Sequence, residues 1–261
     1  MKVVILCGGK GTRIRGVDDD LPKPLIPLGN YPILWHIMRS YAHSNHKNFI
    51  LCLGHKGETI KNFFLNYRAM VSDFTINFSK DHHLEFDKAH EQIDWKVTLA
   101  ETGQETLTGS RIKKIERFIG NDEHFMLTYG DGVCDIDINK LIDFHKSHGK
   151  ILTVSGVRPP GRFGEMEYDV SGKITQFNEK PQASGGRISG GYFVCDREIF
   201  KYLDGNRDDE TFESDPMRKL ARDGQMMMYR HNGFWQCMDT YRDFAFLNEL
   251  VNNNKGPWMK W

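Results

Sequence analysis

A glycine-rich segment directly after the first apolar run has the residue types of an anion-binding loop. The β-branched run at 3–6 predicts a buried strand, and segment 7–13 follows it with three glycines and a threonine. Glycines have no Cβ, so backbone N–H groups can close on an anion, and Arg13 adds a permanent positive charge. Lys23 adds another charge from a stiff position between two prolines. This pattern predicts a site for a phosphorylated ligand.

Two well-known phosphate loops do not fit this spacing. A dinucleotide fingerprint needs a third glycine at position 14, which is Ile14. A P-loop ends in Gly-Lys-Ser/Thr, whereas this segment ends Gly11-Thr12-Arg13. The alternative is a glycine-rich strand-to-helix turn without a ligand, which would leave Arg13 and Lys23 without a function.

Three further residues are candidates for phosphate chemistry. Asp131 lies between two glycines after an expected strand at 124–129, where a carboxylate suits Mg²⁺, although such tripeptides also form ordinary turns. Asp239 precedes the last expected helix, so it is either a metal ligand or the helix N-cap. Lys180 lies before a proline and is either a solvated hairpin end or a cation for a second phosphate.

The composition narrows the class of protein. The 261 residues carry 35 basic and 35 acidic side chains, so a general attraction to nucleic acid or to a membrane surface is not expected. Five cysteines form no CxxC pair and are interpreted as free thiols, several of them buried, in a reducing cytoplasm. The first residues predict a strand, so no signal peptide is expected, and no apolar run reaches membrane-spanning length. The eleven histidines are interpreted as surface residues.

The hydrophobic pattern predicts a single α/β domain over 1–261. Residues 1–150 alternate strands and helices, which favours a mainly parallel sheet between helices, with ligands at the carboxyl ends of its strands. Residues 151–261 predict small antiparallel additions around a pocket and two last helices. The expected strands are 2–7, 48–53, 94–100, 124–129, 151–156, 165–170, 173–179 and 187–195, and the expected helices are 31–44, 57–67, 110–119, 138–148, 212–223 and 240–253.

Taken together, these motifs resemble the sugar nucleotidyltransferases over essentially the whole chain. The glycine segment and the Lys-Pro at 23–24 are shared by members that use many bases. The stretches at 32–38 and 159–164 resemble the cytidylyl branch of that family. The remaining matching stretches are 102–103, 108–111, 129–132, 179–181 and 234–236.

The resemblance implies a Rossmann-like nucleotide-diphosphate-sugar transferase fold. It implies transfer from CTP to a sugar 1-phosphate, with α-D-glucose 1-phosphate the first choice, giving a CDP-sugar and pyrophosphate. It also implies that Asp131 and Asp239 bind Mg²⁺, that Arg13, Lys23 and Asp131 are catalytic, and that the protein is a homo-oligomer. Substrate binding is expected at Leu6, Cys7, Gly8, Gly9, Lys10, Gly11, Thr12, Arg13, Lys23, Thr106, Arg111, Gly130, Lys180 and Ser189.

Four positions depart from the family pattern. Leu21 replaces the first lysine of the family's Lys-Pro-Lys-Pro, whose second lysine is Lys23. Ser110 replaces a glycine, and segment 15–18 replaces an acidic, hydroxyl-bearing stretch. Ser189 replaces an asparagine where the family contacts the sugar, so a different phosphorylated acceptor is an alternative. A non-catalytic nucleotide-sugar sensor is another. The aromatic tail at 258–261 is expected either at an interface or on its own domain.

Overall fold

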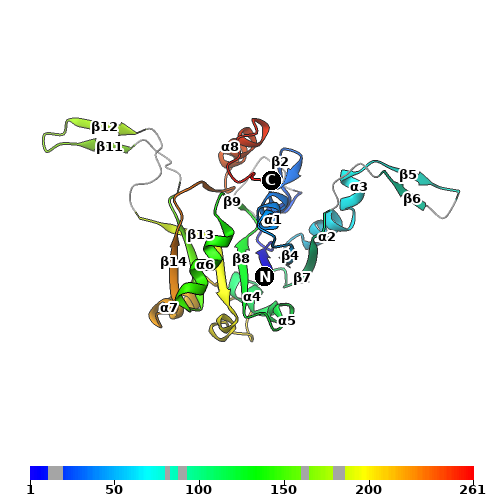
Figure 1. Ribbon diagram of the computed structural model, residues 1–261, viewed down its shortest axis with the longest axis horizontal. Coiled ribbons are helices and arrows are strands. Elements are labelled where there is room, and N and C mark those ends of the chain that lie inside the picture. The colour runs from blue at the N-terminus through cyan, green and yellow to red at the C-terminus, as the bar shows by residue number, and fades with distance from the viewer. Residues whose placement is uncertain (11–19, 80–82, 88–92, 160–164, 179–185) are drawn as a thin grey trace.

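A seven-stranded sheet forms the centre of the computed structural model, which describes residues 1–10, 20–79, 83–87, 93–159, 165–178 and 186–261 (Figure 1). The order across the sheet is β14-β10-β13-β8-β1-β4-β7. These strands are β1 (Val3–Leu6), β4 (Asn48–Leu53), β7 (Lys96–Glu101), β8 (His124–Tyr129), β10 (Leu152–Val157), β13 (Ile188–Asp196) and β14 (Met226–Arg230).

The strand directions confirm the predicted fold class. Strands β8, β1, β4 and β7 run parallel, as do β10 and β14, whereas β13 runs antiparallel to both of its neighbours. The expected strands of the first half lie within a few residues of the observed ones. Strands β10 and β13 are part of the main sheet, so the antiparallel element expected beside it is limited to the hairpin of β11 (Glu165–Tyr168) and β12 (Ile174–Asn178).

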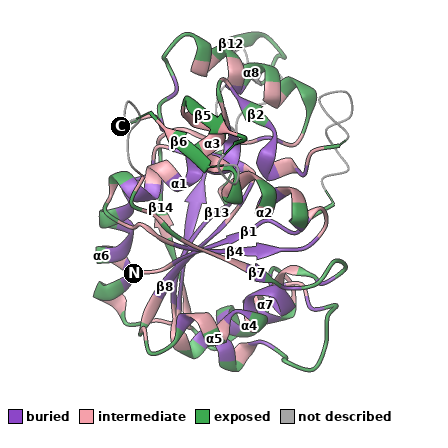
Figure 2. Cartoon of the chain, turned by 90° about the vertical axis from the view of Figure 1, so that its right-hand side faces the viewer, coloured by how far each residue is buried: buried purple, intermediate pink, exposed green. Residues whose placement is uncertain are grey.

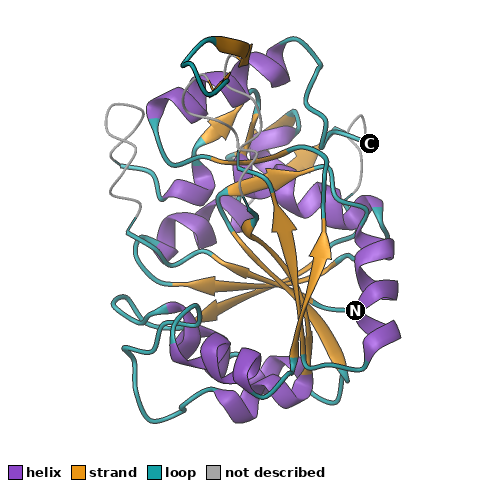
Figure 3. Cartoon of the chain, turned by 90° about the vertical axis from the view of Figure 1, so that its left-hand side faces the viewer, coloured by secondary structure: helices purple, strands orange, loops and turns teal. Residues whose placement is uncertain are grey.

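Both faces of the sheet are covered, because successive side chains of a strand point to opposite faces. In β1, Val3 and Ile5 belong to one hydrophobic cluster, while Val4 and Leu6 belong to another. The first cluster includes residues of α1 (Ile33–His43) and α6 (Ile138–His148), and the second those of α4 (Thr108–Lys114), α5 (Glu116–Ile119) and α7 (Asp215–Arg222). Figures 2 and 3 show the buried strands between these helices. The single helix expected at 110–119 is observed as two short helices, α4 and α5.

Shorter elements surround the sheet. Two hairpins, β5–β6 and β11–β12, project from opposite sides of the molecule (Figure 1). A three-residue ribbon pairs β9 with β15 in antiparallel register. The remaining elements are η1 (Lys23–Leu25), β2 (Pro27–Leu28), β3 (Tyr31–Pro32), α2 (Gly57–Leu65), α3 (Tyr67–Val71), β5 (Phe74–Asn77), β6 (His83–Phe86), β9 (Gly132–Cys134), η2 (Arg197–Tyr202), β15 (Trp235–Cys237) and α8 (Tyr241–Asn252).

The aromatic tail packs on its own chain. Trp258 is 1% exposed, stacks on Phe234 and donates from its indole nitrogen to Nδ1 of His36 at 3.3 Å. His36, His145 and His231 are buried, so the interpretation of all histidines as surface residues is wrong for these three. Each lies against other parts of the chain that are distant in sequence, which a local polar pattern does not reveal. No helix among the described residues is long and apolar enough to cross a membrane.

Candidate active site

A cavity of about 550 Å³ opens at the carboxyl ends of β1 and β8. These two strands lie side by side, and the amide of Gly130 donates to the carbonyl oxygen of Leu6 at 3.0 Å. The volume is in the range of ordinary small-molecule sites. Its lining comes from the two strand ends, the loop before α4 and the Lys23 segment: Leu6, Cys7, Gly8, Gly9, Lys10, Lys23, Pro24, Gln104, Glu105, Thr106, Leu107, Thr108, Arg111, Tyr129, Gly130, Asp131 and Asp239.

A second cavity of about 340 Å³ adjoins the first. Both cavities are lined by Tyr129, Asp131 and Asp239, so these residues lie where the two meet. Ser189 lines only the second one. The site can therefore hold two ligands whose reacting ends meet at the pair of aspartates.

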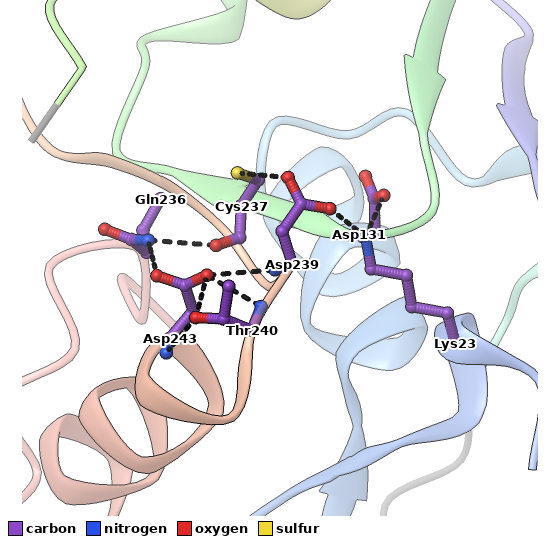
Figure 4. A network of polar contacts seen from close by, with 7 residues as sticks. All are labelled: Lys23, Asp131, Gln236, Cys237, Asp239, Thr240 and Asp243. Atoms are coloured by element: carbon purple, nitrogen blue, oxygen red, sulfur yellow. Dashed lines mark hydrogen bonds and ion pairs between the residues drawn. The ribbon is translucent and has the colours of Figure 1, made fainter. Parts of the chain in front are cut away.

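Lys23 bridges the two aspartates at this junction (Figure 4). Its ammonium donates to Asp131 Oδ2 at 2.7 Å and to Asp239 Oδ1 at 2.6 Å. Burial lowers the pKa of Lys23, but the charges of the two carboxylates and their hydrogen bonds outweigh burial and raise that pKa above its ordinary value. The two carboxylates thus already converge on a position occupied by a cation.

Asp239 is not the N-cap of the last helix. Thr240 caps α8, and the Asp243 carboxylate completes a capping box by accepting from the Thr240 amide. Asp243 also accepts from the backbone amide of Asp239 at 3.1 Å, which fixes the chain just before the cap. The Asp239 carboxylate instead faces Lys23. Of the two sequence interpretations, the cap is wrong, and the metal ligand stays a prediction.

The β9–β15 ribbon brings the two aspartates together. Cys237 pairs with Gly132, and the amide of Met238 donates to the carbonyl oxygen of Asp131 at 2.8 Å. Asp131 directly precedes β9, and Asp239 follows β15 by two residues. Because the strands are antiparallel, the start of one and the end of the other meet at the same end of the ribbon.

Arg111 braces the glycine loop from inside the protein. Its side chain lies 4% exposed, and burial lowers the pKa of its guanidinium, which nonetheless remains charged. The guanidinium donates to the hydroxyl of Thr102 and to the carbonyl oxygens of Gly8, Leu53, Gly103 and Gln104, at 2.7–3.3 Å. These acceptors lie at or just after the carboxyl ends of three neighbouring strands, β1, β4 and β7.

The same contacts explain why position 8 is glycine. A Cβ on Gly8 would lie 2.3 Å from the Arg111 Cζ atom, so any larger residue would displace the guanidinium. Arg111 lines the larger cavity, but the hydrogen bonds of its guanidinium go to protein oxygens. These contacts hold the loop in shape, and the expected contact of Arg111 with a substrate stays a prediction.

The other described candidates also lie at the two cavities. Lys10 forms an exposed ion pair with Glu105 at 2.6 Å, and both residues line the larger cavity. Thr106 is buried, and its hydroxyl accepts from Lys114 Nζ at 3.2 Å. Gly9 lines the larger cavity as well.

The backbone of 6–8 partly serves the fold itself. The Leu6 carbonyl accepts from Gly130, the Cys7 amide donates to Cys52, and the Gly8 carbonyl accepts from Arg111. These groups hold strands and loops in register. The expected substrate binding at Leu6, Cys7 and Gly8 stays a prediction.

Several predicted residues lie outside the described part of the chain. They are Gly11, Thr12, Arg13, Lys180 and the divergent segment 15–18, together with most of the stretch at 159–164. Their roles stay predictions.

Tyr129 is a site residue that the sequence interpretation did not single out. It lines both cavities, and its hydroxyl donates to Glu213, whose other carboxylate oxygen accepts from Thr108 at 2.7 Å. These contacts tie the end of β8 to the start of α4. One signal in the sequence could have identified Tyr129 as a site residue: it is the last strand residue before Gly-Asp-Gly. Side chains at that position reach the carboxyl edge of the sheet.

Comparison with protein families identifies the larger group. The family model described as nucleotidyl transferase matches residues 2–253. The chain belongs to this family. The family predicted from the sequence is thereby confirmed, and the protein is a nucleotidyltransferase enzyme.

The individual relatives are named for the transfer of different nucleotide bases. The glucose-1-phosphate cytidylyltransferase of Salmonella typhi is 42% identical, with all of both chains covered. A mannose-1-phosphate guanyltransferase of Aspergillus oryzae is 27% identical over 97% of this chain and 66% of its own length. The crystal structure of HddC from Yersinia pseudotuberculosis complexed with GMP-PN superposes with a TM-score of 0.68 at 23% identity, covering 96% of this chain and 99% of that one. That structure supports the fold alone.

Proposed function

We propose that this nucleotidyltransferase transfers the cytidylyl group of CTP to α-D-glucose 1-phosphate and releases pyrophosphate. The full-length identity of 42% to a cytidylyltransferase, against 27% to a guanyltransferase, supports CTP and glucose 1-phosphate as the substrates. The observation that carries the chemistry is the pair of cavities that meet at Asp131 and Asp239. The larger cavity suits the nucleotide and the smaller one the sugar phosphate.

The reaction is an in-line displacement at the α-phosphorus of CTP. An oxygen of the acceptor phosphate forms the new P–O bond while the bond to the β-phosphate oxygen breaks, and pyrophosphate takes the electron pair. The acceptor supplies its own nucleophile, so the protein contributes orientation and charge neutralisation. Lys23 is the described cation at the junction, and we assign to it the charge that develops on the leaving pyrophosphate.

Nucleotidyltransferases typically use a divalent metal, and Asp131 and Asp239 fit this requirement. Their carboxylate oxygens lie 2.7 and 2.6 Å from one ammonium, so both already face a single cation position, and oxygen ligands suit a hard cation. We propose Mg²⁺ as the metal, which when bound neutralises phosphate charge. Tyr129 and Arg111 then keep the walls of the cavity in place around the reacting groups.

Arg13 and Lys180 complete the proposal through the resemblance to the sugar nucleotidyltransferases. Arg13 is assigned to the triphosphate and Lys180 to the sugar phosphate. Two anionic substrates repel each other, so cations on both sides of the junction lower the cost of bringing them together.

A panel of nucleoside triphosphates against sugar 1-phosphates, scored by pyrophosphate release, tests this function. CTP with glucose 1-phosphate should give the highest kcat/KM, and UTP should be much poorer because it lacks the 4-amino group. Asp131→Asn should lower turnover by orders of magnitude in a folded protein, and so should EDTA on the wild type.

Three outcomes separate the alternatives. Comparable kcat/KM for UTP would refute cytidine specificity. No pyrophosphate from any pair, with nucleotide-sugar binding retained, would indicate the sensor. Pyrophosphate from CTP with another acceptor only would reassign the sugar.

A different acceptor is the second candidate, and Ser189 favours it. The residue lines the smaller cavity, where the family carries asparagine. One hydroxyl cannot replace the separate donor and acceptor of an amide. A buried sugar hydroxyl left without a partner costs about 1–3 kcal/mol.

We further propose that the protein is a homo-oligomer in the cytoplasm. The projecting β5–β6 hairpin pairs Ile76 with Leu84, which are 40% and 44% exposed, and Phe74 on the same hairpin is 38% exposed. Apolar clusters of this kind suit contact with a second copy of the chain. Ile76→Lys should reduce the mass measured by light scattering, whereas Met166→Lys on the other hairpin is the matched control. The five free cysteines suit a reducing compartment.

A further inference from the structure

The β9–β15 ribbon carries a second group of metal-ligating side chains, at the end opposite the two aspartates. Cys134 pairs with Trp235 at this end, whereas Gly132 pairs with Cys237 at the end near Asp239. Cys134, Asp135 and His231 each offer one ligand atom here, and these atoms all lie within 4.8 Å of one another.

The Asp135 carboxylate and the His231 imidazole lie close together without a hydrogen bond between them. Asp135 Oδ1 is buried and has no hydrogen-bond partner within the described part of the chain, although it lies 2.9 Å from His231 Nε2. The same nitrogen lies 3.3 Å from the carbonyl oxygen of Phe234, which already accepts from the Asp135 amide at 3.1 Å. If a cation took the place of the Phe234 carbonyl beside the imidazole nitrogen, that carbonyl would keep its hydrogen bond from the Asp135 amide. The same cation would give the buried Oδ1 of Asp135 a partner.

The backbone accommodates this grouping through Gly233. A Cβ at that position would lie 2.3 Å from Asp135 Oδ1 and 2.8 Å from a ring carbon of His231. Any other residue would push the carboxylate and the imidazole apart. The glycine thus permits the close approach of the two ligands.

We propose that Cys134, Asp135 and His231 form a binding site for a transition-metal cation of the Zn²⁺ class. Thiolate, imidazole and carboxylate are the ligands that zinc takes in proteins, and a tetrahedral ion with three protein ligands keeps one position for water. Solvent reaches the site, because the Asp135 side chain is 26% exposed. Thiolate and carboxylate together balance the charge of a divalent cation. The nearby Lys260 ammonium donates to the Asp135 carbonyl oxygen.

The consequence for the enzyme is structural. The ribbon has three residue pairs, and isolated two-stranded pairings of this size are marginally stable in water. Asp135 follows β9, and His231 precedes β15. A cation bound to both holds the ribbon closed at its far end. It thereby fixes the register that brings Asp131 and Asp239 together, without entering the reaction.

Cobalt substitution tests the proposal on the full-length protein. The protein is stripped with a chelator, freed of it and titrated with Co²⁺, which gives a near-ultraviolet charge-transfer band only when it is bound by thiolate. One equivalent should produce the band, and Zn²⁺ should displace it. Cys134→Ala should abolish the band. His231→Gln should weaken Co²⁺ binding by at least about 100-fold, because losing only an outer-shell partner of a ligand already costs about 10- to 100-fold.

Cys237→Ala is the matched control, because Cys237 Sγ lies 3.3 Å from Asp239 Oδ2 at the other end of the ribbon. The band should persist in this variant. A band that is lost in Cys237→Ala and kept in Cys134→Ala would place the cation at the aspartates and overturn the proposal. Absence of any thiolate band in the wild type would also overturn it. If Cys134→Ala folds poorly by circular dichroism, Asp135→Asn gives the same test through its weakened Co²⁺ affinity.

Discussion

Replacing Lys23 by methionine is expected to tighten divalent-cation binding while it removes most of the turnover. In the free protein a metal must displace the ammonium from both carboxylates before it binds them. The Lys23 side chain is 11% exposed, but Asp131 and Asp239 are 32% and 30% exposed. Methionine keeps the aliphatic length and removes the charge.

The exposure of the three groups sets the size of the effect. Exposed ion pairs contribute about 0.2–1 kcal/mol, and breaking a buried pair costs about 3–5 kcal/mol. The ion pairs of Lys23 with the two aspartates are partly exposed, so their free-energy contribution lies between these values, at roughly 1–3 kcal/mol. Lys23→Met should therefore lower the metal dissociation constant by about 5- to 150-fold.

Titration calorimetry with Mg²⁺, or Mn²⁺ binding followed by electron paramagnetic resonance, measures this constant in the nucleotide-free protein. Asp131→Asn, alone and combined with Lys23→Met, is the control and should weaken binding in both backgrounds. The kcat of Lys23→Met should fall by about 10²-fold or more, the scale of losing one preorganised electrostatic donor. Equal or weaker metal binding in Lys23→Met would refute competition between the ammonium and the cation.

Three further predictions concern stability and the acceptor. Arg111→Met should lower the free energy of unfolding in urea by about 3–5 kcal/mol, because it removes the charge-assisted hydrogen bonds from the guanidinium to Leu53, Gly103 and Gly8; a loss below about 1 kcal/mol would contradict the bracing role. If glucose 1-phosphate is the native acceptor, Ser189→Asn should leave kcat/KM for it unchanged or lower, and a gain would indicate another acceptor. Burial, and then the charges of neighbouring histidines and Lys146, lower the pKa of His145 to about 4. The unfolded chain takes up this proton near pH 6.5, so the free energy of unfolding should fall by about 3 kcal/mol from pH 6.5 to 4. His145→Gln should remove that part of the fall, and an unchanged slope would contradict the assignment.

The sequence by itself determined the elements whose signal is local. The β-branched run before the glycine segment predicts β1, and strand 124–129 was predicted with the bounds that β8 has. Each of these strands is buried on both faces, so its continuous apolar pattern is visible without its neighbours. The position of Asp131 after a parallel strand likewise follows from the chain alone, because ligands lie at the carboxyl edge of such sheets.

Elements with a weak local pattern depended on their partners. Strand β14 reads Met-Met-Met-Tyr-Arg, without β-branched residues or clear alternation, and it forms because β10 pairs with it. The three-residue strands β9 and β15 exist only as a pair. Pairing between segments that are far apart in the chain leaves little trace in either segment.

Only the tertiary structure decided what the charged side chains contact. A capping aspartate and a metal-binding aspartate look alike before a helix, and the capping box of Thr240 and Asp243 is what directs Asp239 to Lys23. Arg111 reads as a ligand-binding cation in sequence, yet it binds backbone oxygens of loops that only the folded sheet brings together. The hydrophobic pattern of a strand or a helix repeats every two or four residues, so it can be recognised in a short segment. The residue that a charged side chain contacts depends instead on strand register across the whole sheet.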